Sequence, residues 1–310
     1  MNAASLSDQR LWAYLQLMRP ANIVTSWADI LVGFAASGSV VILNEVVTVR
    51  VMLASLVPLA WLLLATTALY GGGVVFNDVF DAELDAKERP ERPIPSGRAS
   101  RQGATWLGSL LLVLGVVAGS QVSWLSATLA TTVALAALVY DAFGKHHPFL
   151  GPLNMGVCRG CNLLLGVSAV PAMVFESWFL ALIPIAYIAA VTAISQGEVH
   201  GGKGSTGIAA LLLVGAVIVG ILALGLLKDY EVLAALPFIA LFAGRVLPAF
   251  VKAVREPSPN QIQRAVKAGV LSLIVLDATV AAGFAGWPFG LLVLSLLPIS
   301  MTLAQLFAVT

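Results

Sequence analysis

Ten stretches of the sequence are almost continuously apolar, and short polar segments separate them. They cover residues 21–42, 51–77, 103–120, 123–140, 149–171, 177–195, 207–227, 232–251, 265–285 and 288–308. A helix needs about 20 mainly apolar residues to cross the ~30 Å of hydrocarbon in a bilayer. Backbone groups there must be satisfied within the segment, and the alternation of a barrel strand is absent. The pattern predicts an all-α, polytopic transmembrane bundle of nine or ten helices.

Composition supports the membrane interpretation and excludes several other classes. Of the 310 residues, 59% are hydrophobic and 11% are charged, which leaves too little polar surface for a particle in water. A net charge of +1 is typical neither of a nucleic-acid-binding protein nor of a strongly acidic one. Two cysteines are too few for a disulfide scaffold. We expect a single membrane-embedded domain over residues 1–310.

Basic residues are distributed unevenly between the two sets of loops. If the amino terminus is cytoplasmic, thirteen Lys and Arg residues lie on that side: Arg10, Arg19, Lys87, Arg89, Arg92, Arg98, Arg101, Lys145, Lys203, Lys252, Arg255, Arg264 and Lys267. The opposite loops hold only Arg50 and Lys228. Positive charge resists translocation, so the asymmetry sets the orientation. We expect a multi-pass protein of the cell inner membrane with a cytoplasmic amino terminus.

An acidic segment follows the second apolar stretch. Asn77, Asp78, Asp81 and Asp85 share one face if the helix continues beyond the membrane surface, because they recur at spacings of three and four. Carboxylates crowded on one face repel each other unless a cation neutralises them. Their oxygens suit Mg²⁺, which typically binds one or two carboxylates together with substrate phosphates. The alternative is a solvated charged loop.

Arginines come directly after these acids. Arg89, Arg92 and Arg98 can clamp phosphate oxygens in a forked geometry. Three prolines between residues 90 and 95 restrict the connecting backbone and would hold the guanidinium groups in place. Carboxylates for a metal beside arginines for phosphate predict a diphosphate site at the inner end of the second helix.

Two strings in this region carry a family resemblance. NDVFDAELD at 77–85 has the pattern NDxxDxxxD, and RPIPSG at 92–97 has the pattern RPI-x-SG. Together they resemble the UbiA superfamily of membrane-embedded prenyltransferases. The Met18-Arg19-Pro20 start and the step from Tyr140 to Lys145 are also similar to the family. EVHGG at 198–202, with GPLNMG-x-CRG at 151–160, resembles the UbiA-like branch encoded in bacterial ebo gene clusters.

The resemblance implies a bundle around a central cavity that opens sideways to lipid. Family members bind an isoprenyl diphosphate through Mg²⁺, ionise it to an allylic carbocation and transfer the prenyl group to a small, commonly aromatic acceptor. The implied metal ligands are Asp78, Asp81 and Asp85; the implied diphosphate-binding residues are Asn77, Arg92, Arg98 and Lys145. Tyr140 is expected to contact the diphosphate or the developing cation. Asp78, Asp81, Tyr140 and Lys145 are the expected catalytic residues.

The loop after the sixth apolar stretch departs from the family pattern. Family members carry a second Asp-rich motif there, whereas residues 195–204 read SQGEVHGGKG, with Glu198 as the single carboxylate. Glycine-rich backbone donates N–H groups to phosphate, and Lys203 supplies positive charge, so Glu198 and Lys203 are expected to bind substrate. A flexible solvated loop is the alternative. The departure predicts weaker Mg²⁺ dependence, or lipid-diphosphate binding without ionising chemistry.

The fifth apolar stretch contains a polar stripe. Asn154, Cys158 and Cys161 recur at four and three residues, and Arg159 and Asn162 fall one position further round the helix. The stripe should face the cavity and avoid lipid. Asn154 and Arg159 are the substrate-binding candidates of this stripe. Small residues for close helix packing explain the CxxC spacing better than a redox or metal role.

Four ionisable residues lie within the apolar stretches, where each costs at least about 2.5 kcal/mol on insertion scales. They are Asp29, Arg159, Arg245 and Asp277. We expect Arg159 to contact an acceptor carboxylate or the diphosphate, with a structural pair to Asp29 as the alternative. Arg245 and Asp277 are expected to form a structural pair between the last helices.

The sequence therefore predicts a Mg²⁺-dependent prenyltransferase. The alternative is a catalytically reduced protein of the same fold that binds or presents a lipid or secondary-metabolite precursor for export. A secondary transporter is a third class, but its paired broken helices are absent from the pattern. The expected partners are an isoprenyl diphosphate, a small acceptor and the bilayer, with no nucleic acid and no obligate protein partner.

Overall fold

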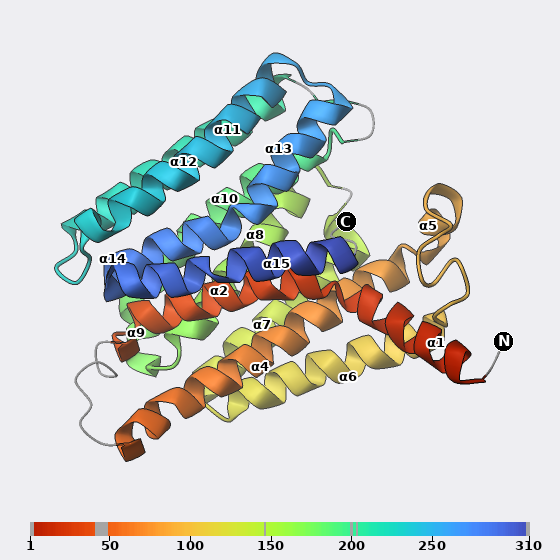
Figure 1. Ribbon diagram of the computed structural model, residues 1–310, viewed down its shortest axis with the longest axis horizontal. Helices are drawn as coiled ribbons and strands as arrows, with labels where there is room; N and C mark the ends of the chain where they lie inside the picture. Colours follow the sequence, from red (N-terminus) through yellow and green to blue (C-terminus); the bar gives the residue numbers. More distant parts are fainter. Residues whose placement is uncertain (1–2, 41–48, 146, 199–200, 203, 308–310) are drawn as a thin grey trace.

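The computed structural model describes residues 3–40, 49–145, 147–198, 201–202 and 204–307, and this part of the chain is helical without strands (Figure 1). The long helices are α1 (Ala3–Met18), α2 (Pro20–Ala36), α4 (Val49–Phe80), α6 (Arg101–Ser120), α7 (Trp124–Val139), α8 (Leu150–Val167), α10 (Leu182–Ser195), α11 (Gly204–Ala223), α12 (Val232–Arg255), α13 (Pro259–Leu271), α14 (Leu273–Leu294) and α15 (Leu296–Leu306). The short ones are α5 (Ala82–Glu88), the π-helical turn η1 (Tyr140–Gly144), α9 (Pro171–Ser177), and the 3₁₀ turns η2 (Trp178–Ala181) and η3 (Leu224–Leu226). The predicted all-α class is confirmed.

Seven helical runs of the described chain are long and apolar enough to cross a membrane. The last run, Pro259–Leu306, contains both of the final apolar stretches of the sequence. The helices α2 and α8 are not among the seven. Much of each is buried against other helices, so polar side chains on these faces find protein partners.

The crossing of α2 and α8 is unusually close because glycines face each other across it. A Cβ atom at Gly33 would lie 2.2 Å from the carbonyl oxygen of Leu163, and one at Gly166 would lie 2.5 Å from that of Ile30. Small residues allow backbones to approach in this way in membrane bundles. The crossing brings the polar residues of the two helices within hydrogen-bonding reach of each other.

The outer surface of the bundle is apolar, as a lipid-facing surface must be. Trp106, Leu212 and Leu226 are 71%, 69% and 89% exposed, respectively. Large hydrophobic residues exposed to this extent would be unfavourable in water but face hydrocarbon in a membrane. The chain is therefore a multi-pass membrane protein.

The last helix packs along α2 and against the second half of α1. Gly286 has a left-handed φ of 80°, and the kink there lets the chain turn back along α2. Ser300 of α15 donates a hydrogen bond to the carbonyl of Ala21 at 2.9 Å. Trp12 of α1 stacks on Phe307 with ring centroids 4.5 Å apart.

Candidate active site

The acidic segment lies where α4 passes into α5. Asp81 sits at a bend, but the helical hydrogen bonds continue through it, from Asp81 N–H to Asn77 at 3.0 Å and from Asp85 N–H to Asp81 at 2.8 Å. The backbone therefore keeps a helical path, as the spacing predicted. Asp78 and Asp85 are both 5% exposed, and one nitrogen of Arg92 contacts both, at 3.3 and 2.8 Å.

Arg19 approaches Asp78 from the start of α2. Its guanidinium lies 2.7 Å from the Asp78 carboxylate. The Arg19 backbone has φ 47° and ψ 66°, the only positive φ of a non-glycine residue among those described. A following proline disfavours the right-handed helical region for this residue, and the left-handed region costs about 1–2 kcal/mol. Strained backbone of this kind is concentrated at functional sites.

Asp81 and Asn77 of the acidic motif face the end of α7. Lys145 forms an ion pair with Asp81, and the Asn77 amide donates to Asp141 at 2.8 Å. Asp141 belongs to η1 and Lys145 follows directly after it, with its N–H bonded to the carbonyl of Tyr140 five residues back. A π turn of this kind stacks residues five apart, so Tyr140 and Lys145 lie on the same side. Such turns occur frequently at functional sites.

Arg98 holds the proline-rich loop to α1 and does not reach the aspartates. It donates to the Gln16 side chain at 2.8 Å and to the Glu91 carbonyl at 2.6 Å. A cavity of about 350 Å³ nevertheless lies between this loop and α1, and its lining residues are Gln16, Arg19, Asp78, Arg89, Glu91, Arg92, Pro93 and Arg98. The arginines named from the sequence therefore lie around one space.

The three aspartates of the motif do not converge on one point. Across the described ranges, no group of three or more His, Cys, Asp or Glu side chains is placed to share a metal ion. Each aspartate is instead beside a cationic side chain. The available donors are carboxylate and amide oxygens, which suit Mg²⁺. This set fits an ion held by one or two carboxylates with phosphate oxygens, and it does not form a three-carboxylate cage.

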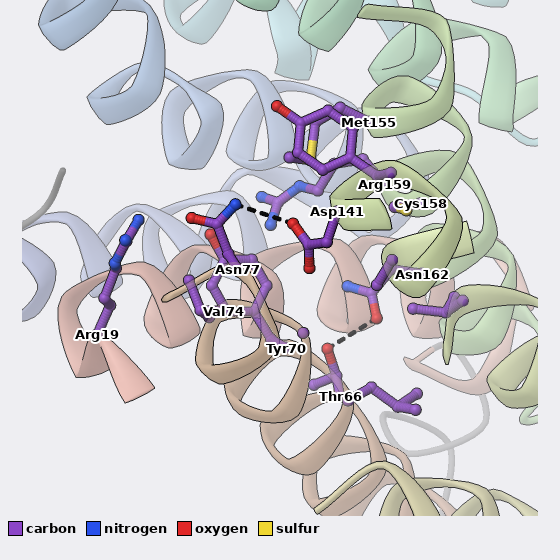
Figure 2. Close-up of a pocket in the computed structure, with 15 residues that line it drawn as sticks. Arg19, Thr66, Tyr70, Val74, Asn77, Asp141, Met155, Cys158, Arg159 and Asn162 are labelled. Atoms are coloured by element: carbon purple, nitrogen blue, oxygen red, sulfur yellow. Dashed lines mark hydrogen bonds between the residues drawn. The ribbon is translucent and has the colours of Figure 1, made fainter. Parts of the chain in front are cut away.

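A second cavity, of about 240 Å³ and mainly apolar, extends from this end into the bundle (Figure 2). Its lining residues are Arg19, Thr66, Leu69, Tyr70, Gly73, Val74, Asn77, Val133, Ala137, Tyr140, Asp141, Met155, Cys158, Arg159 and Asn162. Asn77 and Tyr140, which the sequence predicted, line it near the acidic segment. Arg159 and Cys158 of the predicted polar stripe also face it. Asn154 instead packs against Gly144 of η1.

The deep end of this cavity is closed by a buried polar network between α2 and α8. Arg159 Nε lies 3.1 Å from Asp29, and its other nitrogens donate to the hydroxyl and the carbonyl of Thr25. Asn162 donates to Asp29 at 2.8 Å and accepts from Thr66 at 2.7 Å. The structural pair of Arg159 with Asp29 is therefore present, and Arg159 faces the cavity as well.

The predicted pair between Arg245 and Asp277 is wrong. In the part of the chain that the structure describes, no ion pair joins them, and Nε of Arg245 is buried without a hydrogen-bond partner. Asp277 lies beside Asp29 instead. The reason is that α14 packs against α2 as well as α12, so its carboxylate lies in the polar network around Arg159.

Glu198, in the loop after α10, lies near Arg89 in the loop after α5. Glu198, the last described residue before a gap, is half-buried, and burial raises its pKa while the nearby Arg89 guanidinium lowers it. Its carbonyl accepts a hydrogen bond from Gln263 at 3.4 Å. His200 and Lys203 lie outside the described residues, so the predicted role of Lys203 stays a prediction.

Asp141 and Thr66 are site residues that the sequence pattern did not single out. Asp141 is only 4% exposed and lines the cavity, and Thr66 connects the cavity wall to Asn162. A signal for Asp141 existed, because a carboxylate at the end of an apolar stretch is a functional candidate by default. Thr66 carried no such signal, because threonine is common in membrane helices.

Comparison with known proteins agrees with this architecture. A digeranylgeranylglyceryl phosphate synthase from Methanothrix thermoacetophila is 32% identical over 161 residues, covering 52% of this chain and 56% of that protein. One from Ignicoccus hospitalis is 30% identical over 193 residues, covering 62% and 59%. The chain thus spans a little over half the length of these curated relatives.

Solved structures and a family model extend the likeness over most of the chain. A structure of digeranylgeranylglyceryl phosphate synthase in membranes aligns with a TM-score of 0.67 at 21% identity, covering 89% of this chain and 99% of that one. A UbiA homolog from Archaeoglobus fulgidus bound to GPP and Mg²⁺ aligns with a TM-score of 0.60 at 15% identity, covering 91% and 99%. At these identities the structures show the fold. The model of the UbiA prenyltransferase family matches residues 30–267, and the chain belongs to this family.

Proposed function

We propose that this protein transfers a prenyl group from an isoprenyl diphosphate to a small acceptor within the membrane, with Mg²⁺ as cofactor. The observation that carries the proposal is the junction of two environments at Arg19, which lines both cavities. On one side an apolar cavity runs into the bundle, and on the other side acids and arginines surround a polar space. A prenyl diphosphate has the same division, with an apolar chain joined to a highly charged head.

The charged residues have assigned roles in this proposal. Asp78 and Asp81 hold Mg²⁺, with Asp85 acting through Arg92, which it contacts at 2.8 Å. Bound Mg²⁺ neutralises charge that develops on the departing diphosphate. Arg19 and Lys145 bind diphosphate oxygens after leaving their aspartate partners, and Arg92 binds them while Asp85 holds it in place. The GPP and Mg²⁺ bound to the A. fulgidus homolog support this assignment.

The apolar cavity holds the prenyl chain and the acceptor. Tyr70 and Tyr140 present aromatic rings, whose faces tolerate an allylic carbocation without reacting with it. Exclusion of water by the apolar walls protects such a cation from hydrolysis. We propose a small aromatic acceptor, as in many family members. An alcohol is the second candidate, because the relatives are named as synthases of a glyceryl phosphate product.

The location that we propose is the cell inner membrane with the site on the cytoplasmic side. The excess of Lys and Arg in one set of loops supports this orientation. Both the acidic segment and the arginine-rich loop belong to that set. A water-soluble diphosphate head made in the cytoplasm then reaches the site without crossing the bilayer.

A catalytically reduced protein that binds or presents a lipid remains the alternative, because the second loop has a single carboxylate in its sequence. The two functions differ in whether diphosphate is released. Purified protein in lipid nanodiscs is incubated with Mg²⁺ and prenyl diphosphates of several chain lengths, with and without phenolic and alcohol acceptors. Diphosphate release and prenylated product are expected. Mg²⁺-dependent binding without release would favour the alternative.

Substitutions test whether the aspartates carry the metal. Asp78→Asn and Asp81→Asn are expected to abolish Mg²⁺-dependent binding of the prenyl diphosphate. Glu83→Gln is the matched control, because Glu83 lies in the same segment with its side chain 88% exposed. Unchanged binding in both aspartate variants would remove the metal assignment.

A further inference from the structure

One carboxylate that lines the apolar cavity has no role in binding the metal or the diphosphate in the proposed function. Asp141 belongs to the π turn η1 and is 4% exposed. It is the only aspartate or glutamate among the described residues that line the apolar cavity, and no histidine or lysine lines it. The side chain therefore stands alone as a proton acceptor in that space.

The partners of Asp141 differ from those of the motif aspartates. Asp78, Asp81 and Asp85 each contact an arginine or lysine, whereas Asp141 Oδ1 accepts a hydrogen bond from the neutral amide of Asn77. Figure 2 shows its second oxygen directed into the cavity, between Asn77 and Asn162. The amide of Asn77 fixes the carboxylate without neutralising it, because an amide carries no charge.

The proposed reaction needs such a group. When the bond between C1 of the prenyl chain and the diphosphate oxygen breaks, both electrons leave with the diphosphate. The attacking acceptor atom forms a bond to C1 and must then lose its proton. A general base within reach of that atom accelerates this step, typically by 10²–10⁴-fold. The tyrosine hydroxyls and the cysteine thiol on the cavity wall are poor proton acceptors until they ionise, and the guanidinium groups of Arg19 and Arg159 are already protonated.

We propose that Asp141 is the catalytic base that takes the proton from the attacking atom of the acceptor. This inference rests on the proposed prenyl transfer. The proton moves from the acceptor's hydroxyl oxygen, or from its attacked ring carbon, to Oδ2 of Asp141, and the carboxylate becomes a neutral acid. The Asn77 amide holds Oδ1 throughout. Because Asn77 precedes Asp78 in the chain, this hydrogen bond connects the base to the acidic segment.

The test separates proton transfer from binding and from ionisation. Asp141→Asn keeps the size of the side chain and an oxygen that accepts from Asn77. Full-length protein in nanodiscs is compared with this variant for Mg²⁺-dependent geranyl diphosphate binding, for diphosphate release without acceptor, and for prenyl transfer to a phenolic or alcohol acceptor. Binding and acceptor-free release are expected within about threefold of wild type, and transfer is expected to fall about 100-fold or more.

Chemical rescue distinguishes a base from a structural residue. Transfer by Asp141→Ala is expected to rise severalfold with added formate, whose carboxylate fits the space left by the side chain, and Glu83→Gln should not respond. Transfer within threefold of wild type in Asp141→Asn would overturn the proposal, as would an equal fall of binding, release and transfer. Absence of transfer by the wild-type protein would contradict the proposed function itself, and with it the base.

Discussion

Asp29 of α2 and Arg159 of α8 form an ion pair across the centre of the bundle, with 3.1 Å between Oδ2 and Nε. Asp29 is fully buried and Arg159 is 5% exposed, and one face of the arginine lines the apolar cavity. Removal of one partner from a buried pair leaves an unpaired charge, which costs more than the pair itself contributes. The pair therefore contributes both to the stability of the bundle and to the wall at the deep end of the cavity.

The first prediction concerns this pair. Arg159→Met is expected to lower the free energy of unfolding by about 3–5 kcal/mol, because Asp29 is left as a buried charge. Adding Asp29→Asn to that variant should recover part of the loss, since it removes the carboxylate that Arg159 had paired. Thermal unfolding in detergent of both single variants and the double variant measures the coupling. Strictly additive losses would mean that the two residues do not interact energetically.

The second prediction uses the Asp81–Lys145 pair. Lys145→Met is expected to tighten binding of Mg²⁺ alone, because a competing cation is removed from Asp81, and to weaken binding of the prenyl diphosphate at saturating Mg²⁺ by tenfold or more. Calorimetric titrations of the metal and of the diphosphate measure the two effects. Lys87→Met, at an exposed position of α5, is the control. Weaker binding of both ligands would contradict the idea that Lys145 leaves Asp81 in order to bind the diphosphate.

The third prediction concerns the strained backbone before α2. Arg19→Gly and Arg19→Ala both remove the guanidinium from Asp78, but only glycine adopts a φ of 47° without strain. The alanine variant is therefore expected to be less stable than the glycine variant by about 1 kcal/mol, and the two should lose diphosphate affinity equally. Thermal unfolding in detergent gives the comparison. Equal stability would show that the chain relaxes at this position.

The fourth prediction concerns the crossing of α2 and α8. Gly33→Ala is expected to destabilise the protein by about 1–3 kcal/mol, because its Cβ would meet the Leu163 carbonyl at 2.2 Å. Gly215→Ala is the matched control: it lies within α11, and a Cβ there has no neighbour within 4 Å. That change should be neutral or stabilising by up to about 1 kcal/mol. Similar unfolding temperatures for the two variants would argue against the close crossing.

The fifth prediction tests Glu198. Burial raises the pKa of this carboxyl, so the folded protein favours the protonated form and loses stability as pH rises through that pKa. Glu198→Gln should therefore unfold at a slightly higher temperature than wild type at pH 7, with the difference vanishing in acid. Its effect on diphosphate binding should be smaller than that of Asp78→Asn. An equal effect would mean that the second loop carries metal as the first does.

The sequence predicted the elements and much of the site because both depend on local pattern. Apolar length predicted the helices, and the spacing of Asp78, Asp81 and Asp85 predicted a helical path past the end of α4. Which cation each acid contacts depends on distant segments, since Arg19 is 59 residues from Asp78 and Lys145 is 64 from Asp81. Spacing within one segment therefore suggested a shared metal site, whereas tertiary packing divides the acids between partners.

The buried charges show the same limit. Asp29, Arg159 and Asp277 were recognised as exceptional because charge inside an apolar stretch is costly. Their pairing required knowledge of which helices are neighbours. The alternative that Arg159 pairs with Asp29 was open from the sequence, and the pair of Arg245 with Asp277 was wrong because α14 packs against α2. The sequence marks Asp141 only as a carboxylate at the end of an apolar stretch, because its place on the cavity wall depends on helices distant in the chain.

The π turn at Tyr140–Gly144 holds one residue more than an ordinary α-helical turn. Deleting one of Ala142, Phe143 or Gly144 would let the segment wind as an α-helix, in which the N–H of the lysine, then four residues after Tyr140, bonds to the same carbonyl. The ammonium group would keep its direction toward Asp81, so a homologous chain that is one residue shorter at this point can retain the ion pair.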